Sequence, residues 1–243
     1  AERVATGHYA RVLRDARGTP YLATGVDATK DQSYFLYTCT RAQLERLVFP
    51  LGAATKREVR EEATRIGIPG AGKGESQELC FVGAGAHAYA SFVEERAAER
   101  VRPGPIVDDE GRVVGEHAGV HRFTVGQRKG LGVALGRPVF VTRIDVATST
   151  VHLGGEASLE ATTAELDDVA LAPGISLPLR ARVRVRYRHE GADADVEQTA
   201  SGARVRFAGP VRAVTRGQIA VLYDGERVLG GGRIASVSSA GAS

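Results

Sequence analysis

Apolar residues recur with a helical period in one short stretch of the chain and alternate with polar residues in many others. The helical stretch covers residues 56–66, where the apolar positions three or four residues apart are Val59, Ala63 and Ile66. Thr55 and Glu58 have the spacing of a capping box at its start. We therefore predict an amphipathic helix here, and a second helix from residue 87 to about residue 100, before the Pro103-Gly104-Pro105 stop.

Short apolar or alternating runs, separated by turn residues, predict strands in most of the remaining chain. The expected hairpins join residues 12–13 to 21–25, residues 105–107 to 113–114, and residues 221–223 to 228–229, the last through an Asp224-Gly225 turn. The opening residues look like the end of a buried strand followed by a turn. Regular strand spacing from residue 160 to residue 235 predicts a small β barrel or sandwich.

One predicted strand, residues 180–188, carries five arginines at every second position. They would project from one face about 6.6 Å apart, since a strand rises about 3.3 Å per residue. Arginine contacts phosphate oxygens well, so the stripe favours a nucleic-acid partner. A solvated sheet face that protects an edge explains the same pattern.

A second basic element is the glycine loop of residues 126–132, where Arg128 and Lys129 stand among three glycines. Exposed backbone N–H groups of such a loop can approach an anion closely. An ordinary polar loop is the alternative. The loop and the arginine strand together favour an RNA-like partner.

The composition suits a protein with more than one modest domain. The chain has 243 residues, of which 43% are hydrophobic and 25% charged, and its net charge is +3. Two cysteines are too few for a disulfide framework and no apolar run is long enough for a membrane span, so a reducing, cytoplasmic setting without a membrane partner is expected. The sequence contains no methionine, which suggests a fragment of a longer protein.

Cys80 is the residue best placed for covalent chemistry. It lies between an apolar run and the turn residue Gly83, and a cysteine thiolate can act as a nucleophile or carry sulfur when it is accessible. From this segment alone, a buried core thiol in a strand is the simpler interpretation. Cys39 is expected to serve in packing, and the cysteine and histidine spacing gives no metal pattern.

Two glycine-rich segments imitate nucleotide-binding loops. Residues 67–74 lack the preceding strand, the following helix and the hydroxyl that a phosphate-binding loop needs. Residues 83–88 follow a strand-like run and open a predicted helix, with Asp108 downstream, which leaves a dinucleotide-dependent oxidoreductase as an alternative.

Several ordered blocks of the sequence resemble a bacterial tRNA-specific 2-thiouridylase (a tRNA-uridine 2-sulfurtransferase), over its C-terminal two-thirds. The blocks are Ala5-Thr6-Gly7-His8-Tyr9, residues 30–36, residues 76–82, Gly115-Glu116-His117-Ala118-Gly119, residues 124–132 and Leu229-Gly230-Gly231-Gly232. The family's N-terminal ATP loop and first catalytic cysteine would lie upstream of residue 1, and Cys39 cannot replace that cysteine. This resemblance leads us to expect no activity from the chain alone.

The resemblance implies an α/β tail of an ATP-pyrophosphatase (PP-loop) domain, then an α+β central domain and an all-β C-terminal barrel. The corresponding boundaries are residues 1–48 for the tail, 49–160 for the central domain with Cys80, 161–237 for the barrel and 238–243 for a disordered end.

The resemblance also implies a reaction and a set of site residues. The family uses ATP and Mg²⁺ to adenylate the C2 oxygen of the wobble uridine of tRNA. A cysteine persulfide, here on Cys80, then delivers to C2 the sulfur received from a donor protein such as a cysteine desulfurase or a sulfur relay protein. The implied contacts are Gly7 with ATP, and His8, Lys30, Asp31, Gln32, Arg186, Tyr187 and Gln218 with tRNA. A non-catalytic RNA-binding module, in which Cys80 is incidental, is the main alternative.

Overall fold

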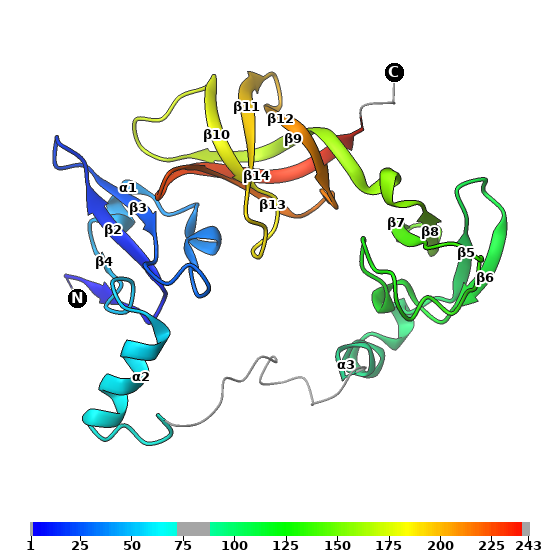
Figure 1. The fold of residues 1–243 in the computed structure, drawn as a ribbon, viewed down its shortest axis with the longest axis horizontal. Helices are drawn as coiled ribbons and strands as arrows, with labels where there is room; N and C mark the ends of the chain where they lie inside the picture. The colour runs from blue at the N-terminus through cyan, green and yellow to red at the C-terminus, as the bar shows by residue number, and fades with distance from the viewer. Residues whose placement is uncertain (1, 72–87, 240–243) are drawn as a thin grey trace. The chain divides into compact units, whose positions relative to one another are not determined.

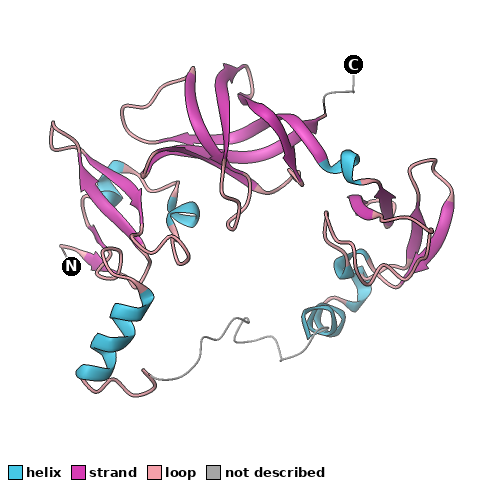
Figure 2. Cartoon of the chain, viewed as in Figure 1, coloured by secondary structure: helices cyan, strands magenta, loops and turns pink. Residues whose placement is uncertain are grey.

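The computed structural model describes residues 2–71 and 88–239, and these fold into two compact units. One unit combines residues 1–73 with residues 161–243, and the other covers residues 74–160 (Figures 1 and 2). Segments from the two ends of the sequence therefore share one unit.

The N-terminal part of the first unit contains a parallel strand pair, β1 (Val4–Ala5) with β4 (Leu47–Val48), and an antiparallel hairpin, β2 (Ala10–Arg14) with β3 (Pro20–Thr24). The 3₁₀ helix η1 (Ser33–Leu36) and the short helix α1 (Arg41–Leu44) follow the hairpin. The predicted first strand is present as β1, but it is not buried in this chain, since Val4 is 53% exposed in its two-stranded sheet.

Helix α2 (Lys56–Arg65) confirms the strongest helical prediction. The Thr55 hydroxyl accepts the N–H of Glu58 at 3.3 Å, and the Glu58 carboxylate accepts the N–H of Thr55 at 2.7 Å. These reciprocal bonds satisfy two backbone donors that the first helical turn leaves unpaired.

Six strands of residues 160–238 close into a barrel. Their order around the barrel is β13 (Ile219–Asp224), β10 (Leu179–Arg184), β11 (Ala192–Thr199), β12 (Gly202–Arg212), β9 (Glu160–Leu171) and β14 (Arg227–Ser238), which returns to β13. Alternate residues point inward, so valines such as Val183, Val196 and Val205 fill the core and are fully buried. Closure pairs every barrel strand on both sides.

The three glycines at 230–232 are required by this closure. A Cβ atom at Gly230, Gly231 or Gly232 would come within 3 Å of a backbone oxygen of a neighbouring strand. Because β14 hydrogen-bonds both β9 and β13 here, larger residues would force those strands apart.

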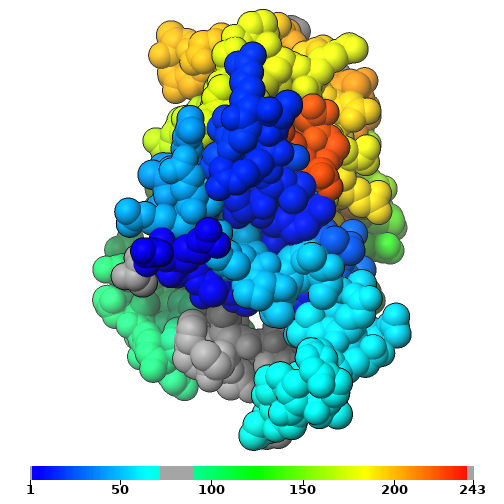
Figure 3. Space-filling view, turned by 90° about the vertical axis from the view of Figure 1, so that its left-hand side faces the viewer, coloured from blue at the N-terminus to red at the C-terminus, as the bar shows by residue number. Residues whose placement is uncertain are grey.

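The N-terminal hairpin extends the barrel sheet. Arg227 of β14 pairs with Ala23 of β3, so β3 and β2 continue the sheet beyond the barrel. Figure 3 shows the hairpin, in dark blue, packed against the orange part of β14. This pairing fixes the N-terminal segment to the barrel within one unit.

Two details of the strand predictions are wrong. The predicted strand over residues 180–188 ends at Arg184, and the chain then turns, with the N–H of His189 bonded to the carbonyl of Arg186 at 3.0 Å and Gly191 at a φ of +94°. The two-residue turn of the last hairpin is Gly225-Glu226, one residue later than predicted, because glycine takes the positive φ (+54°) of the first turn position.

The second unit consists of helix α3 (Ala88–Arg96), the 3₁₀ segment η2 (Ala98–Arg100) and a four-stranded sheet of order β6-β5-β8-β7. Its strands are β5 (Gly104–Val107), β6 (Val113–His117), β7 (Phe140–Asp145) and β8 (Thr150–Gly154), and short 3₁₀ helices η3 (Val120–Arg122) and η4 (Glu156–Leu159) follow β6 and β8. The predicted second helix and the β5–β6 hairpin are confirmed.

Candidate functional site

The first candidate residues lie where the chain leaves the parallel strand pair. The N–H of Thr6 bonds to the carbonyl of Val48 at 3.1 Å, and Gly7 follows, exposed. A Cβ at Gly7 would meet a single side-chain atom of Leu51, at 3.8 Å, so the space beside this backbone is open. Ligands of α/β sheets bind at the carboxyl ends of the strands, and Gly7 has that position after β1.

His8 is half-buried and held on two sides. Its Nδ1 lies 2.8 Å from the hydroxyl of Thr6, and its ring packs edge-on against Phe49 with centroids 6.2 Å apart. The next residue, Tyr9, connects His8 to the second candidate segment, because the N–H and carbonyl of Tyr9 bond to the side chain and the backbone N–H of Gln32 at 3.1 and 2.8 Å.

Asp31 lies at the centre of the second segment and is buried, with 3% exposure. Its carboxylate accepts the N–H of Gly25 at 3.0 Å and both the N–H and the hydroxyl of Ser33, at 3.1 and 3.0 Å. It also pairs with Arg184 of β10 at 2.8 Å, across 153 sequence positions. The carboxylate thus joins the N-terminal segment to the barrel.

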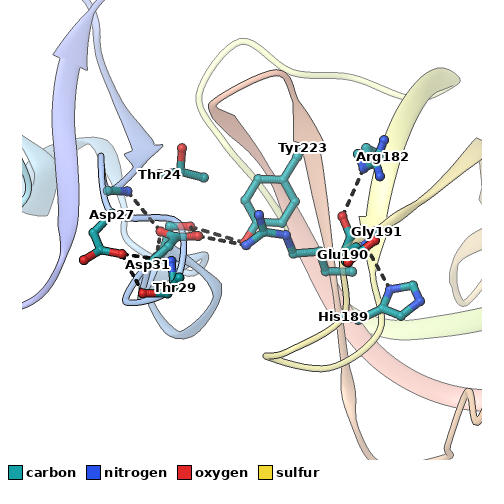
Figure 4. Close-up of polar contacts among 12 residues, drawn as sticks. Thr24, Asp27, Thr29, Asp31, Arg182, His189, Glu190, Gly191 and Tyr223 are labelled. Atoms are coloured by element: carbon teal, nitrogen blue, oxygen red, sulfur yellow. Dashed lines mark hydrogen bonds and ion pairs between the residues drawn. The ribbon is translucent and has the colours of Figure 1, made fainter. Parts of the chain in front are cut away.

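Tyr223 of β13 completes this junction. Figure 4 shows its ring beside the Asp31 loop. The guanidinium of Arg184 lies over the ring, 4.6 Å from its centroid, and the Tyr223 hydroxyl is 3.3 Å from that of Ser33. Burial raises the pKa of Tyr223 to about 12, so the phenol stays protonated and available as a donor.

An aromatic cluster extends the junction toward the barrel turn. Tyr34 is buried, its pKa is raised by burial to about 12, and its hydroxyl donates to the carbonyl of Ile219, which follows Gln218, at 2.7 Å. Phe35 packs against Tyr187 with centroids 4.7 Å apart. Lys30, Gln32, Phe35, Arg186, Tyr187 and Gln218 therefore belong to one region of the first unit, which we call the junction surface.

The arginine stripe does not form one basic face. Arg180 pairs with Asp195 at 2.8 Å, Arg182 donates to the carbonyl of Glu190 at 3.0 Å, and Arg184 turns to Asp31. Arg186 and Arg188 are exposed in the turn beyond β10. The prediction that all five arginines project from one face of a single strand is therefore wrong, because β10 ends at Arg184 and three of the five take part in contacts within the chain.

The basic glycine loop is ordered by one side chain. The amide of Gln127 accepts the N–H of Thr124 at 3.0 Å and donates to the carbonyl of Lys129 at 2.9 Å. Gly126, Gly130 and Gly132 all have positive φ, which glycine adopts at little cost. Arg128 and Lys129 are consequently held on the surface of the second unit.

The two cysteines differ in what the structure says of them. Cys80, the proposed sulfur carrier, and residues 83–87 of the dinucleotide-like segment lie outside the described residues. Cys39 packs against the cluster that contains Tyr34 and Leu44, as predicted, and burial raises the pKa of its thiol.

Residues 2–71 and 88–239 contain no cluster of ligating side chains that would hold a metal ion. Within the same residues, no helix has the length and apolar character needed to cross a membrane.

Three family models match successive parts of the chain. They are described as a tRNA methyl transferase HUP domain (residues 1–84), a tRNA methyl transferase PRC-barrel domain (residues 90–155) and an aminomethyltransferase beta-barrel domain (residues 164–234). This order confirms the predicted fold class, an α/β tail, a central α+β domain and a C-terminal barrel. The class is that of the multidomain proteins that combine these three domains.

Whole-chain relatives narrow this class. The chain is 57% identical over 237 residues to the tRNA-specific 2-thiouridylase MnmA of Sorangium cellulosum, a match of 95% of this chain and 61% of that protein. It is 48% identical to the protein of that name from Moorella thermoacetica and 42% identical to the one from Roseiflexus, covering 66% and 67% of them. The chain belongs to the tRNA-specific 2-thiouridylase family. It spans about three-fifths to two-thirds of the length of these relatives.

Sequence reasoning missed Tyr223 and Phe35 as parts of this region, and it placed Arg184 in the arginine stripe without its contact to Asp31. No local pattern distinguishes Arg184 from its neighbours in the stripe, because its partner Asp31 is remote in sequence. The resemblance gave a signal for Phe35, because this residue contacts Tyr187, which the resemblance implied for tRNA contact.

Proposed function

We propose that this chain is part of an enzyme that replaces the C2 oxygen of the wobble uridine of tRNA with sulfur, in a reaction driven by ATP. The observation that supports this most is the junction surface, where Asp31, Tyr34 and Phe35 contact Arg184, Ile219 and Tyr187 in one folded unit, next to the implied tRNA-binding residues Lys30, Gln32, Arg186 and Gln218 in the sequence. Such a surface offers cations, an amide and aromatic rings, the groups that bind unpaired RNA.

Within this proposal, Asp31 supports tRNA binding indirectly. Its carboxylate is buried and accepts four hydrogen bonds from the protein itself. It would position Lys30 and Gln32, which flank it, for contact with tRNA. His8 would join them through the bonds between Tyr9 and Gln32.

ATP would approach the chain at Gly7, where the exposed backbone after β1 has room for a ligand. ATP with Mg²⁺ supplies the adenylyl group that converts the C2 oxygen into a leaving group. The remaining ATP contacts would come from the loop that the family carries upstream of the Ala5-Thr6-Gly7-His8 block.

Cys80 would carry the sulfur as a persulfide, loaded by a donor protein. The terminal sulfur attacks C2 with its electron pair, AMP departs with the former carbonyl oxygen, and the sulfur–sulfur bond breaks when a second thiol forms a disulfide with Cys80. A persulfide suits this step because it is nucleophilic near neutral pH. A tRNA substrate is consistent with a cytoplasmic reaction.

The test is the 2-thiouridine content of tRNA, measured by mass spectrometry after reaction with ATP and a sulfur donor. The enzyme would be the chain extended upstream by the family's ATP loop and first cysteine. Cys80→Ser should abolish product, whereas Cys39→Ser, the matched control, should retain it. Full activity of Cys80→Ser would refute the proposed role.

A second candidate, an RNA-binding module without catalysis, is favoured by the fact that the whole junction surface lies in the first unit. This alternative predicts tRNA binding with strong salt dependence but no 2-thiouridine from the extended enzyme.

A further inference from the structure

Phe35 is an exposed aromatic residue in a region that is otherwise well packed. It is 57% exposed, although its neighbours Ser33 and Tyr34 on η1 are buried. An aromatic side chain gains free energy when it leaves water, so a phenyl ring held on a surface suggests a binding partner.

The ring of Phe35 is held in place by its neighbours. Tyr34 meets it edge-on, with centroids 5.4 Å apart and planes at 89°, and Tyr187 lies beside it at 4.7 Å and 36°. Tyr34 is itself fixed by its bond to the carbonyl of Ile219. Phe35 and Tyr187 thus form an aromatic pair of defined orientation.

Arginines precede and follow Tyr187 in the sequence. Arg186 and Arg188 are exposed, and Arg186 donates to the backbone carbonyl of Arg212 at 3.2 Å. In the described part of the chain, neither arginine pairs with a carboxylate, in contrast to Arg180 and Arg184. An aromatic ring beside unneutralised arginines fits a nucleobase with its phosphates better than it fits an apolar protein segment.

We propose that Phe35 and Tyr187 form a stacking platform for one unpaired base of the tRNA, with the adjoining phosphates contacted by Arg186 and Arg188. This inference rests on the proposed function and adds Phe35, which neither the resemblance nor the comparisons assign. The platform reads the flat face of a base, so it would bind any nucleobase presented there and would orient the strand rather than select its sequence.

The chain contains no tryptophan, so Phe35→Trp introduces a single fluorescent reporter into the platform. Stacking of a base on this indole should quench its fluorescence as tRNA is added. The quenching curve should give the same dissociation constant as the anisotropy of labelled tRNA. Ile66→Trp, at a position 55% exposed beyond α2, is the matched control and should keep its fluorescence.

Substitutions at Phe35 separate stacking from simple packing. Phe35→Ala and Phe35→Leu should each weaken tRNA binding between about 5-fold and 150-fold, the range expected for loss of one stacked base. Phe35→Tyr should bind like the original chain. All three should keep the circular dichroism of the original and unfold cooperatively, because more than half of the ring is exposed.

Two results would overturn the platform. One is tRNA binding that leaves the indole of the Phe35→Trp variant unquenched, and the other is an unchanged affinity for Phe35→Leu, which would make the ring a protein-packing residue. If no variant and no original chain binds tRNA, the proposed function fails and the platform fails with it. The first two outcomes leave the proposed function standing, so the two failures are distinguishable.

Discussion

Replacing Asp31 by Ala should detach the N-terminal segment from the barrel. The substitution removes the acceptor of four hydrogen bonds, two of them from the backbone N–H groups of Gly25 and Ser33. It also leaves Arg184, whose side chain is 23% exposed, without its carboxylate. A buried charge and buried donors lose their partners at the same time.

The expected cost is about 3–5 kcal/mol, the usual result of removing one partner from a buried ion pair. Unsatisfied buried donors cost about 1–3 kcal/mol each, which agrees with this range when water reaches some of them. Arg184→Met should lower the free energy of unfolding less than Asp31→Ala does, because Asp31 still accepts the N–H groups of Gly25 and Ser33. The double variant should be less destabilised than the sum of the single variants by about 1–3 kcal/mol.

Native-state hydrogen exchange measures these effects locally. The amides of Gly25 and Ser33 report the junction, and the amides of Val183 and Leu222 report the barrel core. Asp31→Ala should speed exchange at the junction most. The matched control is Asp195→Ala, which breaks the exposed pair with Arg180 and should leave all four amides unchanged.

The reasoning would be refuted if Asp31→Ala exchanged like Asp195→Ala, or if the double variant simply summed the two single effects. Either result would mean that the contact between Asp31 and Arg184 does not hold the two segments together.

Three further predictions concern groups outside this pair. Burial raises the pKa of Tyr34 and Tyr223 to about 12, so the stability they contribute is complete below pH 10 and is lost as the pH rises to about 12, at about 1.4 kcal/mol per pH unit for each tyrosine. Phenolate absorbance should show late-titrating groups, two of which are lost in Tyr34→Phe and Tyr223→Phe, and titration of Tyr34 and Tyr223 near pH 10 would contradict this. The Cys39 thiol, whose pKa is raised by burial, should react with iodoacetamide more slowly in the folded than in the urea-unfolded chain, and equal rates would argue against its packing. Thr55→Ala should destabilise α2 by about 1 kcal/mol, and Thr55→Ser should retain the original stability of the helix, both measured by amide exchange. Equal exchange rates in Thr55→Ala and the original chain would mean that the capping box does not stabilise α2.

Local patterns predicted the elements whose cause is local. The capping pair Thr55 and Glu58 lies within one helical turn, and the β5–β6 hairpin has its turn residues between two apolar runs. Such features need no knowledge of the rest of the chain. The resemblance supplied the order of the domains. It also indicated a barrel for the C-terminal domain, which the local patterns alone left open between a barrel and a sandwich.

Long-range contacts account for what the sequence could not predict. Alternation placed the arginines from 180 to 188 on one face, but the strand ends where the Arg186–His189 turn begins and Arg184 binds a carboxylate 153 positions away. The exposure of Phe35 likewise depends on the position of Tyr187 from another segment. A single periodicity cannot distinguish an arginine that is free to bind phosphate from one that is used in an internal pair.

The role of Cys80 as the carrier of sulfur is tested most directly by isotope tracing. Cys80 in the extended enzyme would be loaded with a heavy isotope of sulfur as the persulfide, freed of donor, and mixed with tRNA and ATP for a single turnover. The account predicts heavy 2-thiouridine in an amount equal to the label lost from the Cys80 peptide. Label that stays on Cys80 while unlabelled 2-thiouridine forms would contradict it.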